Sequence, residues 1–216
     1  FLTGTLAEAA APFLGRRLLV ANADLGVGVG RPTAGVPTLV ANADGDELHF
    51  VHAGSGRLEC PLGVLRFAAN DYLYVPQAMP HRLVLDGPAH LLTIEALSPL
   101  RIPSQYRSEE GQISMYAPYT HRDFREPEWP EGGPEALGAP RRLIVKSGGQ
   151  LTALELSPDP FDLVGWDGQL WPFAFPILAF QPKTGLVHLP PTIHTTFAGA
   201  GYVVCSFVPR AVDFHE

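Results

Sequence analysis

Three side chains in the first half of the sequence, Glu47, His49 and His81, are of types that hold metal ions. Glu47 and His49 lie in the apolar run ELHFV, which predicts a strand, so both side chains point to the same face. His81 follows the turn PQAMP. A carboxylate with two imidazoles suits iron(II), manganese or zinc. The alternative is that Glu47 hydrogen-bonds the neighbouring turn, or His81, and binds no metal.

The surrounding segment, NADGDELHFVHAGSGRL, resembles the first half of a cupin barrel. A glycine-rich turn, a short strand and a Gly-x-Gly turn follow one another, and His81 stands where the second cupin motif places a histidine. Metal-binding cupins carry one or two histidines just before the glutamate, where this chain has Val40, Ala41, Asn42 and Ala43. The missing histidines favour a barrel that is mainly scaffold.

A second candidate is the loop TGLVHLPPTIHTTF, which holds His188 and His194. Its two prolines stiffen the backbone, and a stiff loop can hold an imidazole at a fixed point for general acid–base chemistry. The alternative is a surface or capping histidine. Asp159, Asp162 and Asp167 lie in a turn-rich stretch and are expected to form capping bonds.

The elements that position these residues are short strands. Apolar runs such as GVLRFA, DYLYV and HLLTIEA alternate with turn residues, which predicts an all-β cupin or jelly-roll-like sandwich with few short helices. We expect a first barrel with an N-terminal arm over residues 1–103. An ordered aromatic and proline-rich excursion follows over 104–140, and further strands of the same domain over 141–216 lead into a C-terminal cupin absent from the chain.

Composition excludes several classes of function. The chain has 216 residues and a formal net charge of −7, and no basic stripe that could neutralise nucleic-acid phosphates. It has no apolar run of about 18 residues, so no membrane partner is expected. Two cysteines fit a cytoplasmic setting with free thiols. The pairs Arg16-Arg17 and Arg141-Arg142 are interpreted as solvated surface charge. G-x-S-x-G, P-loop and complete G-x-G-x-x-G motifs are absent.

Several stretches in order are similar to the homogentisate 1,2-dioxygenase family, in particular its bacterial branch. They are NADGDELHFVHAGSGRLE, DYLYVP, SQYRSEEGQ, APYTHRDFREPE, PFDLVGWDG, QPKTGLVHLPPTIHTTF and VVCSFVPRAVDFH. The similarity runs from about residue 17 to the end, and its most specific parts are PFDLVGWDG and SFVPRAVDFH.

This resemblance implies a bicupin oxidoreductase that opens the ring of homogentisate with O₂ to give maleylacetoacetate, in tyrosine and phenylalanine catabolism. It implies a non-haem Fe(II) held by two histidines and one glutamate, and a homo-oligomer, trimer or hexamer. The family's iron ligands follow the motif matched by SFVPRAVDFH, so we expect them beyond Glu216. HLPPTI matches the family loop whose histidine is assigned to proton transfer, which makes His188 the catalytic candidate.

Two features leave another interpretation open. His81 stands where bacterial members of the family often have a non-ligand, and Glu216 replaces a usual proline. The chain begins with Phe1 and ends abruptly, which suggests a piece of a longer protein. The alternative is a non-catalytic or differently catalytic cupin, a small-molecule-binding or assembly domain.

Overall fold

Short strands joined by turns make up most of the described chain. The computed structural model describes residues 15–35, 38–131, 141–162, 171–182 and 191–209. The strands are β1 (Arg17–Ala21), β2 (Leu25–Gly30), β3 (Leu39–Asn42), β4 (Asp46–Ala53), β5 (Gly56–Cys60), β6 (Gly63–Phe67), β7 (Asp71–Val75), β8 (Arg82–Leu85), β9 (His90–Ala96), β10 (Arg141–Ser147), β11 (Gln150–Leu156), β12 (Phe173–Pro176), β13 (Thr195–Gly199) and β14 (Tyr202–Cys205). Short 3₁₀ helices lie at η2 (Ser104–Tyr106), η3 (His121–Asp123), η4 (Ile177–Ala179) and η5 (Pro191–His194).

Two antiparallel sheets enclose the main core. One has the order β1-β2-β9-β4-β7-β12 and the other β6-β5-β8. Apolar side chains of both sheets meet in a single buried cluster, because every second residue of each strand points inward. Its members include Val51, Leu58, Cys60, Leu65, Phe67, Leu73, Val75, Met79, Leu83 and Leu91. The all-β cupin-like sandwich predicted from the sequence is therefore confirmed.

Strand β4 has the alternation that the sequence predicts. Val51 belongs to the cluster between the sheets, and Glu47 and His49 lie on the same face of β4. All three are buried, whereas Leu48 and Phe50 point the other way into a second, aromatic cluster. Glu47 and His49 therefore point into the barrel and not into solvent.

The aromatic excursion packs on the six-stranded sheet. Tyr106 and Tyr119 are buried, and with Phe124 they join the second cluster, which holds Tyr72 and Tyr74 of β7. The Tyr119 ring centroid lies 5.3 Å from that of Phe175 in β12 and 5.5 Å from that of Phe124.

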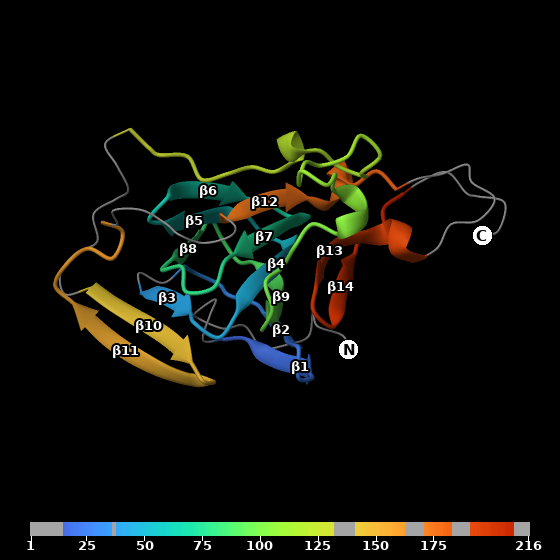
Figure 1. Cartoon of the computed structure of the whole chain (residues 1–216). Helices are drawn as coiled ribbons and strands as arrows, with labels where there is room; N and C mark the ends of the chain where they lie inside the picture. The colour runs from blue at the N-terminus through green and yellow to red at the C-terminus, as the bar shows by residue number, and fades with distance from the viewer. Residues whose placement is uncertain (1–14, 36–37, 132–140, 163–170, 183–190, 210–216) are drawn as a thin grey trace.

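The end of this excursion closes one side of the sandwich. Arg125 exchanges two backbone hydrogen bonds with Ala174 of β12, at 2.9 and 3.0 Å, and Glu128 exchanges two with Val64 of β6, at 2.8 and 2.9 Å. Figure 1 shows this yellow-green segment running past β12 and β6. We call residues 125–130 the strap. It covers one edge strand of each sheet, and exposed edges otherwise invite pairing with other chains.

A third sheet joins early and late parts of the chain. Its order is β11-β10-β3, with β10 parallel to β3 and antiparallel to β11. Figure 1 shows the β10–β11 hairpin projecting beyond the barrel. Residues after 140 therefore share a sheet with residues of the first barrel. Cys60 and Cys205 are free thiols, and Cys205 is only half-buried.

The turn between β4 and β5 requires glycine. Gly54 has φ +96°, which side chains rarely adopt, and a Cβ there would lie 2.7 Å from the Cβ of Ala89. The following loop residue, Ser55, donates a 2.8 Å hydrogen bond to Asp86. This turn joins β4, the strand that carries Glu47 and His49, to β5.

Candidate functional site

A buried polar cluster lies inside the first barrel, around the carboxylate of Glu47. Asn42, the last residue of β3, donates from Nδ2 to Glu47 Oε1 at 2.9 Å. The Oδ1 atom of the same Asn42 accepts the backbone N–H of Asp44 at 3.0 Å, which shapes the turn between β3 and β4. The sequence alternative in which Glu47 bonds its neighbouring turn therefore describes this contact correctly.

Arg16 supplies the positive charge of the cluster. Its Nη2 lies 2.6 Å from Glu47 Oε1, and the two side chains are 14% and 1% exposed. A buried carboxylate is strongly destabilising unless a cation and hydrogen bonds compensate it. Arg16 provides that compensation, so its interpretation as solvated surface charge is wrong, whereas its neighbour Arg17 is exposed. The error arose because Arg16 and Glu47 are 31 residues apart and only the fold brings them together.

His49 extends the cluster across two strands. Its Nδ1 lies 2.8 Å from Thr93 Oγ1, and its Nε2 lies 3.4 Å from Glu47 Oε2. Neither Nε2 nor Oε2 makes a regular hydrogen bond to another residue that the structure describes. We assign the proton to Nε2, facing the carboxylate, because Nδ1 then accepts the Thr93 hydroxyl. Thr93, His49 and Glu47 thus form a polar chain.

His81 is the third predicted member, and its backbone pairs with Val40 of β3. Its Nδ1 donates to the carbonyl of Met79 at 2.9 Å. Burial lowers the pKa of His81 to about 4, although the charge of Glu47 acts in the opposite direction. His81 is therefore neutral near pH 7 and adds no charge to the cluster.

The carboxyl of Glu47 stays ionised. Burial acts to raise its pKa, but the charge of Arg16, together with the neighbouring imidazole of His49, holds the pKa well below its usual range. The cluster thus contains one buried anion, one buried cation and polar groups that orient them.

The cluster does not fit a metal ion. Across the described ranges, the structure gathers no group of three or more histidine, cysteine, aspartate or glutamate side chains that could hold one. A guanidinium already neutralises Glu47, and a dication beside it would be repelled. An iron site made of two histidines and a glutamate is therefore not assigned to this barrel.

A pocket of about 320 Å³ opens beside the cluster. Gly26 and Gly28 of β2 stand opposite Glu95 and Thr93 of β9 in the sheet. Because these two glycines carry no side chains, only backbone borders the pocket at these two positions of β2. The lining residues are Arg16, Leu18, Gly26, Gly28, Thr93, Glu95, Lys146, Gly149 and Leu151. Lys146 forms an ion pair with Glu95.

Two other candidates, His194 and Asp159, make their contacts outside this cluster. His188 and Asp167 fall outside the residues that the structure describes. His194 is buried, with its ring centroid 4.6 Å from that of Phe207. Asp159 accepts the backbone N–H of Phe161 at 3.0 Å, the turn role that the sequence predicts.

Sequence reasoning missed Thr93 and Lys146. No local motif marks either of them. Only the pairing of β9 with β4, and of β10 with β3, brings them to the same end of the barrel.

The described chain includes no helix that is long and apolar enough to cross a membrane. Fold and site together define an all-β cupin-type domain with a buried arginine–glutamate pair in its barrel. Residues 33–177 match the family described as "Homogentisate 1,2-dioxygenase N-terminal". The chain belongs to this family.

Three relatives place the chain more closely. The chain is 35% identical to a Saccharolobus solfataricus protein named "Putative dioxygenase SSO1533". This match covers 99% of the chain and 55% of that protein. The chain is also 30% identical to the homogentisate 1,2-dioxygenase of Rhodopseudomonas palustris BisB18, over 71% of this chain and 34% of that protein. The chain is 31% identical to the homogentisate 1,2-dioxygenase of Pseudomonas putida GB-1, over 71% of this chain and 35% of that protein. The chain spans about half or a third of the length of these relatives.

Solved structures similar to the chain include cupin domains. One from Shewanella frigidimarina is 16% identical with a TM-score of 0.35, and the similarity covers 38% of this chain and 78% of that one. A cupin protein from Desulfitobacterium hafniense is 18% identical with a TM-score of 0.35, and the similarity covers 38% of this chain and 75% of that one.

Proposed function

We propose that the chain forms the N-terminal part of an Fe(II)-dependent dioxygenase that opens an aromatic ring with O₂. The proposed reaction converts homogentisate to maleylacetoacetate in tyrosine and phenylalanine catabolism. The observation that carries the proposal is the family match over residues 33–177. Relatives named homogentisate 1,2-dioxygenase, at about 30% identity, support the choice of substrate.

In this proposal the first barrel is a framework. Its interior is filled by the ion pair of Arg16 and Glu47 and by apolar side chains of both sheets. The iron ligands, two histidines and one glutamate, are proposed to lie beyond Glu216, because the family resemblance places them after the stretch SFVPRAVDFH. We propose a cytoplasmic homo-oligomer, trimer or hexamer, whose mass can be measured by light scattering.

His188 is the one residue of this chain that we propose to act on the substrate. Its position in HLPPTI supports a role in moving a proton. A His188→Ala variant of the full-length protein is expected to lose kcat while it keeps its iron content. The matched control is His121→Ala, which changes an exposed histidine in η3.

The function is tested by O₂ uptake. Full-length protein loaded with Fe(II) is expected to consume one O₂ per homogentisate and to form a product that absorbs as maleylacetoacetate. Phenylacetate, which lacks the ring hydroxyls, is the control substrate. If iron-loaded protein takes up no O₂ with homogentisate, the proposal is wrong.

A second candidate function rests on the pocket of about 320 Å³ beside Arg16 and Thr93. A cupin barrel with an open pocket and a buried polar cluster could bind a small organic acid without catalysis. Thermal-shift screening with small carboxylic acids tests this candidate. A stabilising acid whose effect is lost in Lys146→Gln, which removes a cation that lines the pocket, would favour it over a framework role.

A further inference from the structure

A pocket with two arginines lies where the chain leaves β9 and meets the β13–β14 hairpin. It measures about 450 Å³. Side chains from the segment 98–107 line one part of it, and residues 198–200, at the end of β13 and in the following turn, line the other. Arg101 and Arg107 are its charged residues, and no acidic side chain lines it. We call it the arginine pocket. It is locally cationic in a chain whose formal net charge is −7.

Hydrogen bonds join the two parts of the arginine pocket. Arg101 exchanges two backbone hydrogen bonds with Ala198, at 2.8 and 2.9 Å. Ser98 Oγ accepts the backbone N–H of Ala200 at 2.9 Å, across a separation of 102 residues in the sequence. The folded chain therefore holds the backbone around this pocket in place.

The second arginine follows the short helix η2. The backbone N–H of Arg107 donates to the carbonyl of Ser104 at 3.1 Å, which ends this helix. The preceding residue, Tyr106, is buried in the second, aromatic cluster. The hydroxyl of Ser104 also lines the pocket and has no partner among the residues that the structure describes. It adds a neutral donor beside the two cations.

Both guanidinium groups of the arginine pocket lack a counter-charge. Arg101 and Arg107 are exposed, and neither side chain forms a hydrogen bond or an ion pair with the described part of the chain. Glu109 and Glu110 follow Arg107 in the sequence but do not line the pocket. Two cations beside one cavity repel each other, and a bound anion would relieve that repulsion.

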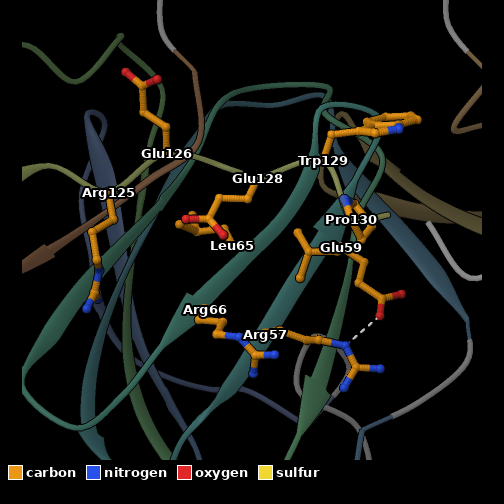
Figure 2. A pocket seen from close by; sticks show the side chains of 10 residues that line it. Arg57, Glu59, Leu65, Arg66, Arg125, Glu126, Glu128, Trp129 and Pro130 are labelled. Atoms are coloured by element: carbon orange, nitrogen blue, oxygen red, sulfur yellow. Dashed lines mark hydrogen bonds and ion pairs between the residues drawn. The ribbon is translucent and has the colours of Figure 1, made fainter. Parts of the chain in front are cut away.

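A second pocket shows that arginines alone do not make such a site. The pocket of about 700 Å³ under the strap also contains arginines. Figure 2 shows Arg66 there together with Glu126 and Glu128. Glu59 lines the same pocket. These carboxylates repel an anion, whereas the arginine pocket has no such group in its lining.

We propose that the arginine pocket binds a phosphate dianion, either free or as the end group of a small organic phosphate. The phosphate oxygens accept hydrogen bonds from Arg101, Arg107 and the hydroxyl of Ser104. A carboxylate carries a single charge and its oxygens lie in one plane, which suits one guanidinium. A phosphate carries more charge, and its oxygens point in several directions, so they can reach donors that line different parts of a pocket. Pro99 and Ile102 offer apolar surface to an organic group.

The test is calorimetric titration of the full chain, in a phosphate-free buffer, with inorganic phosphate and with glycerol 3-phosphate. Arg101→Gln and Arg107→Gln are each expected to weaken binding about tenfold or more, because each removes a charge-assisted hydrogen bond. Arg66→Gln is the matched control. It removes the same charge from an exposed arginine that lines the pocket under the strap, and the affinity should not change. Circular dichroism verifies that all three variants are folded.

Comparison of the probes identifies the ligand. Acetate is expected to bind about tenfold or more weakly than inorganic phosphate. Tighter binding of glycerol 3-phosphate than of inorganic phosphate assigns the site to an organic phosphate, and equal affinities assign it to free phosphate. The proposal is overturned if neither phosphate shows saturable binding, if acetate binds as tightly, or if either arginine variant behaves like Arg66→Gln. Because the readout needs neither iron nor turnover, a failed oxygen-uptake assay leaves this result unaffected.

Discussion

Replacing Arg16 with methionine is predicted to leave Glu47 as an uncompensated buried charge. The guanidinium lies 2.6 Å from a carboxylate that is 1% exposed, and Arg16 itself is 14% exposed. Two unit charges about 4 Å apart attract by about 4 kcal/mol at an effective dielectric constant of about 20. Loss of one partner from a buried pair costs about 3–5 kcal/mol. We therefore expect the free energy of unfolding to fall by about 3–4 kcal/mol at pH 7.

The loss of unfolding free energy in Arg16→Met should depend on pH. Without Arg16, burial raises the pKa of Glu47 above its value in the unfolded chain. A raised pKa means that the folded state of the variant binds the proton of Glu47 more tightly than the unfolded state does. The loss of stability is therefore smaller in acid and grows as the pH rises through the pKa of Glu47 in the folded variant.

Urea unfolding of the full chain, followed by tryptophan fluorescence, measures this effect. Arg17→Met is the matched control, because Arg17 is the exposed neighbour. The double variant with Glu47→Gln should recover much of the loss, because no buried charge then remains. The reasoning is refuted if Arg16→Met costs no more than Arg17→Met, or if the loss is the same in the Glu47→Gln background.

Three further predictions concern the same barrel. His81, with a pKa of about 4 against 6.5 when unfolded, should make stability fall by up to about 3 kcal/mol as the pH drops from 6.5 to 4, and His81→Gln should flatten that part of the pH profile. Thr93→Val should cost about 1–3 kcal/mol in urea unfolding by removing the donor to a buried imidazole, with exposed Thr152→Val near neutral. Gly54→Ala should lower the melting temperature, whereas Gly87→Ala, with open space around it, should not.

The sequence predicted the parts of the site that follow from local periodicity. Alternation along one strand placed Glu47 and His49 on one face, and both are buried. The expectation for His81 came instead from its match to the second cupin motif, and this histidine is buried too. The strand prediction succeeds because a strand's period of two depends only on residues close in sequence.

What the sequence did not predict depends on pairing between distant strands. Arg16 stands beside Arg17, and no neighbouring residue predicts that Arg16 is buried, because only the folded barrel brings it to Glu47. GVGVG indicated strands broken by glycines, but its place beside a pocket follows from the register of β2 with β9. The composition of the excursion indicated order, whereas its contact with the edges of β6 and β12 required the fold.

The central claim is that the first barrel is a framework held by an ion pair and that the iron is bound elsewhere. Iron content of the full-length protein, measured by mass spectrometry after Fe(II) loading of wild type, Glu47→Gln and His81→Gln, tests it most directly. The account predicts the same stoichiometric iron in all three proteins, each folded by circular dichroism. Loss of iron from either folded variant would contradict it.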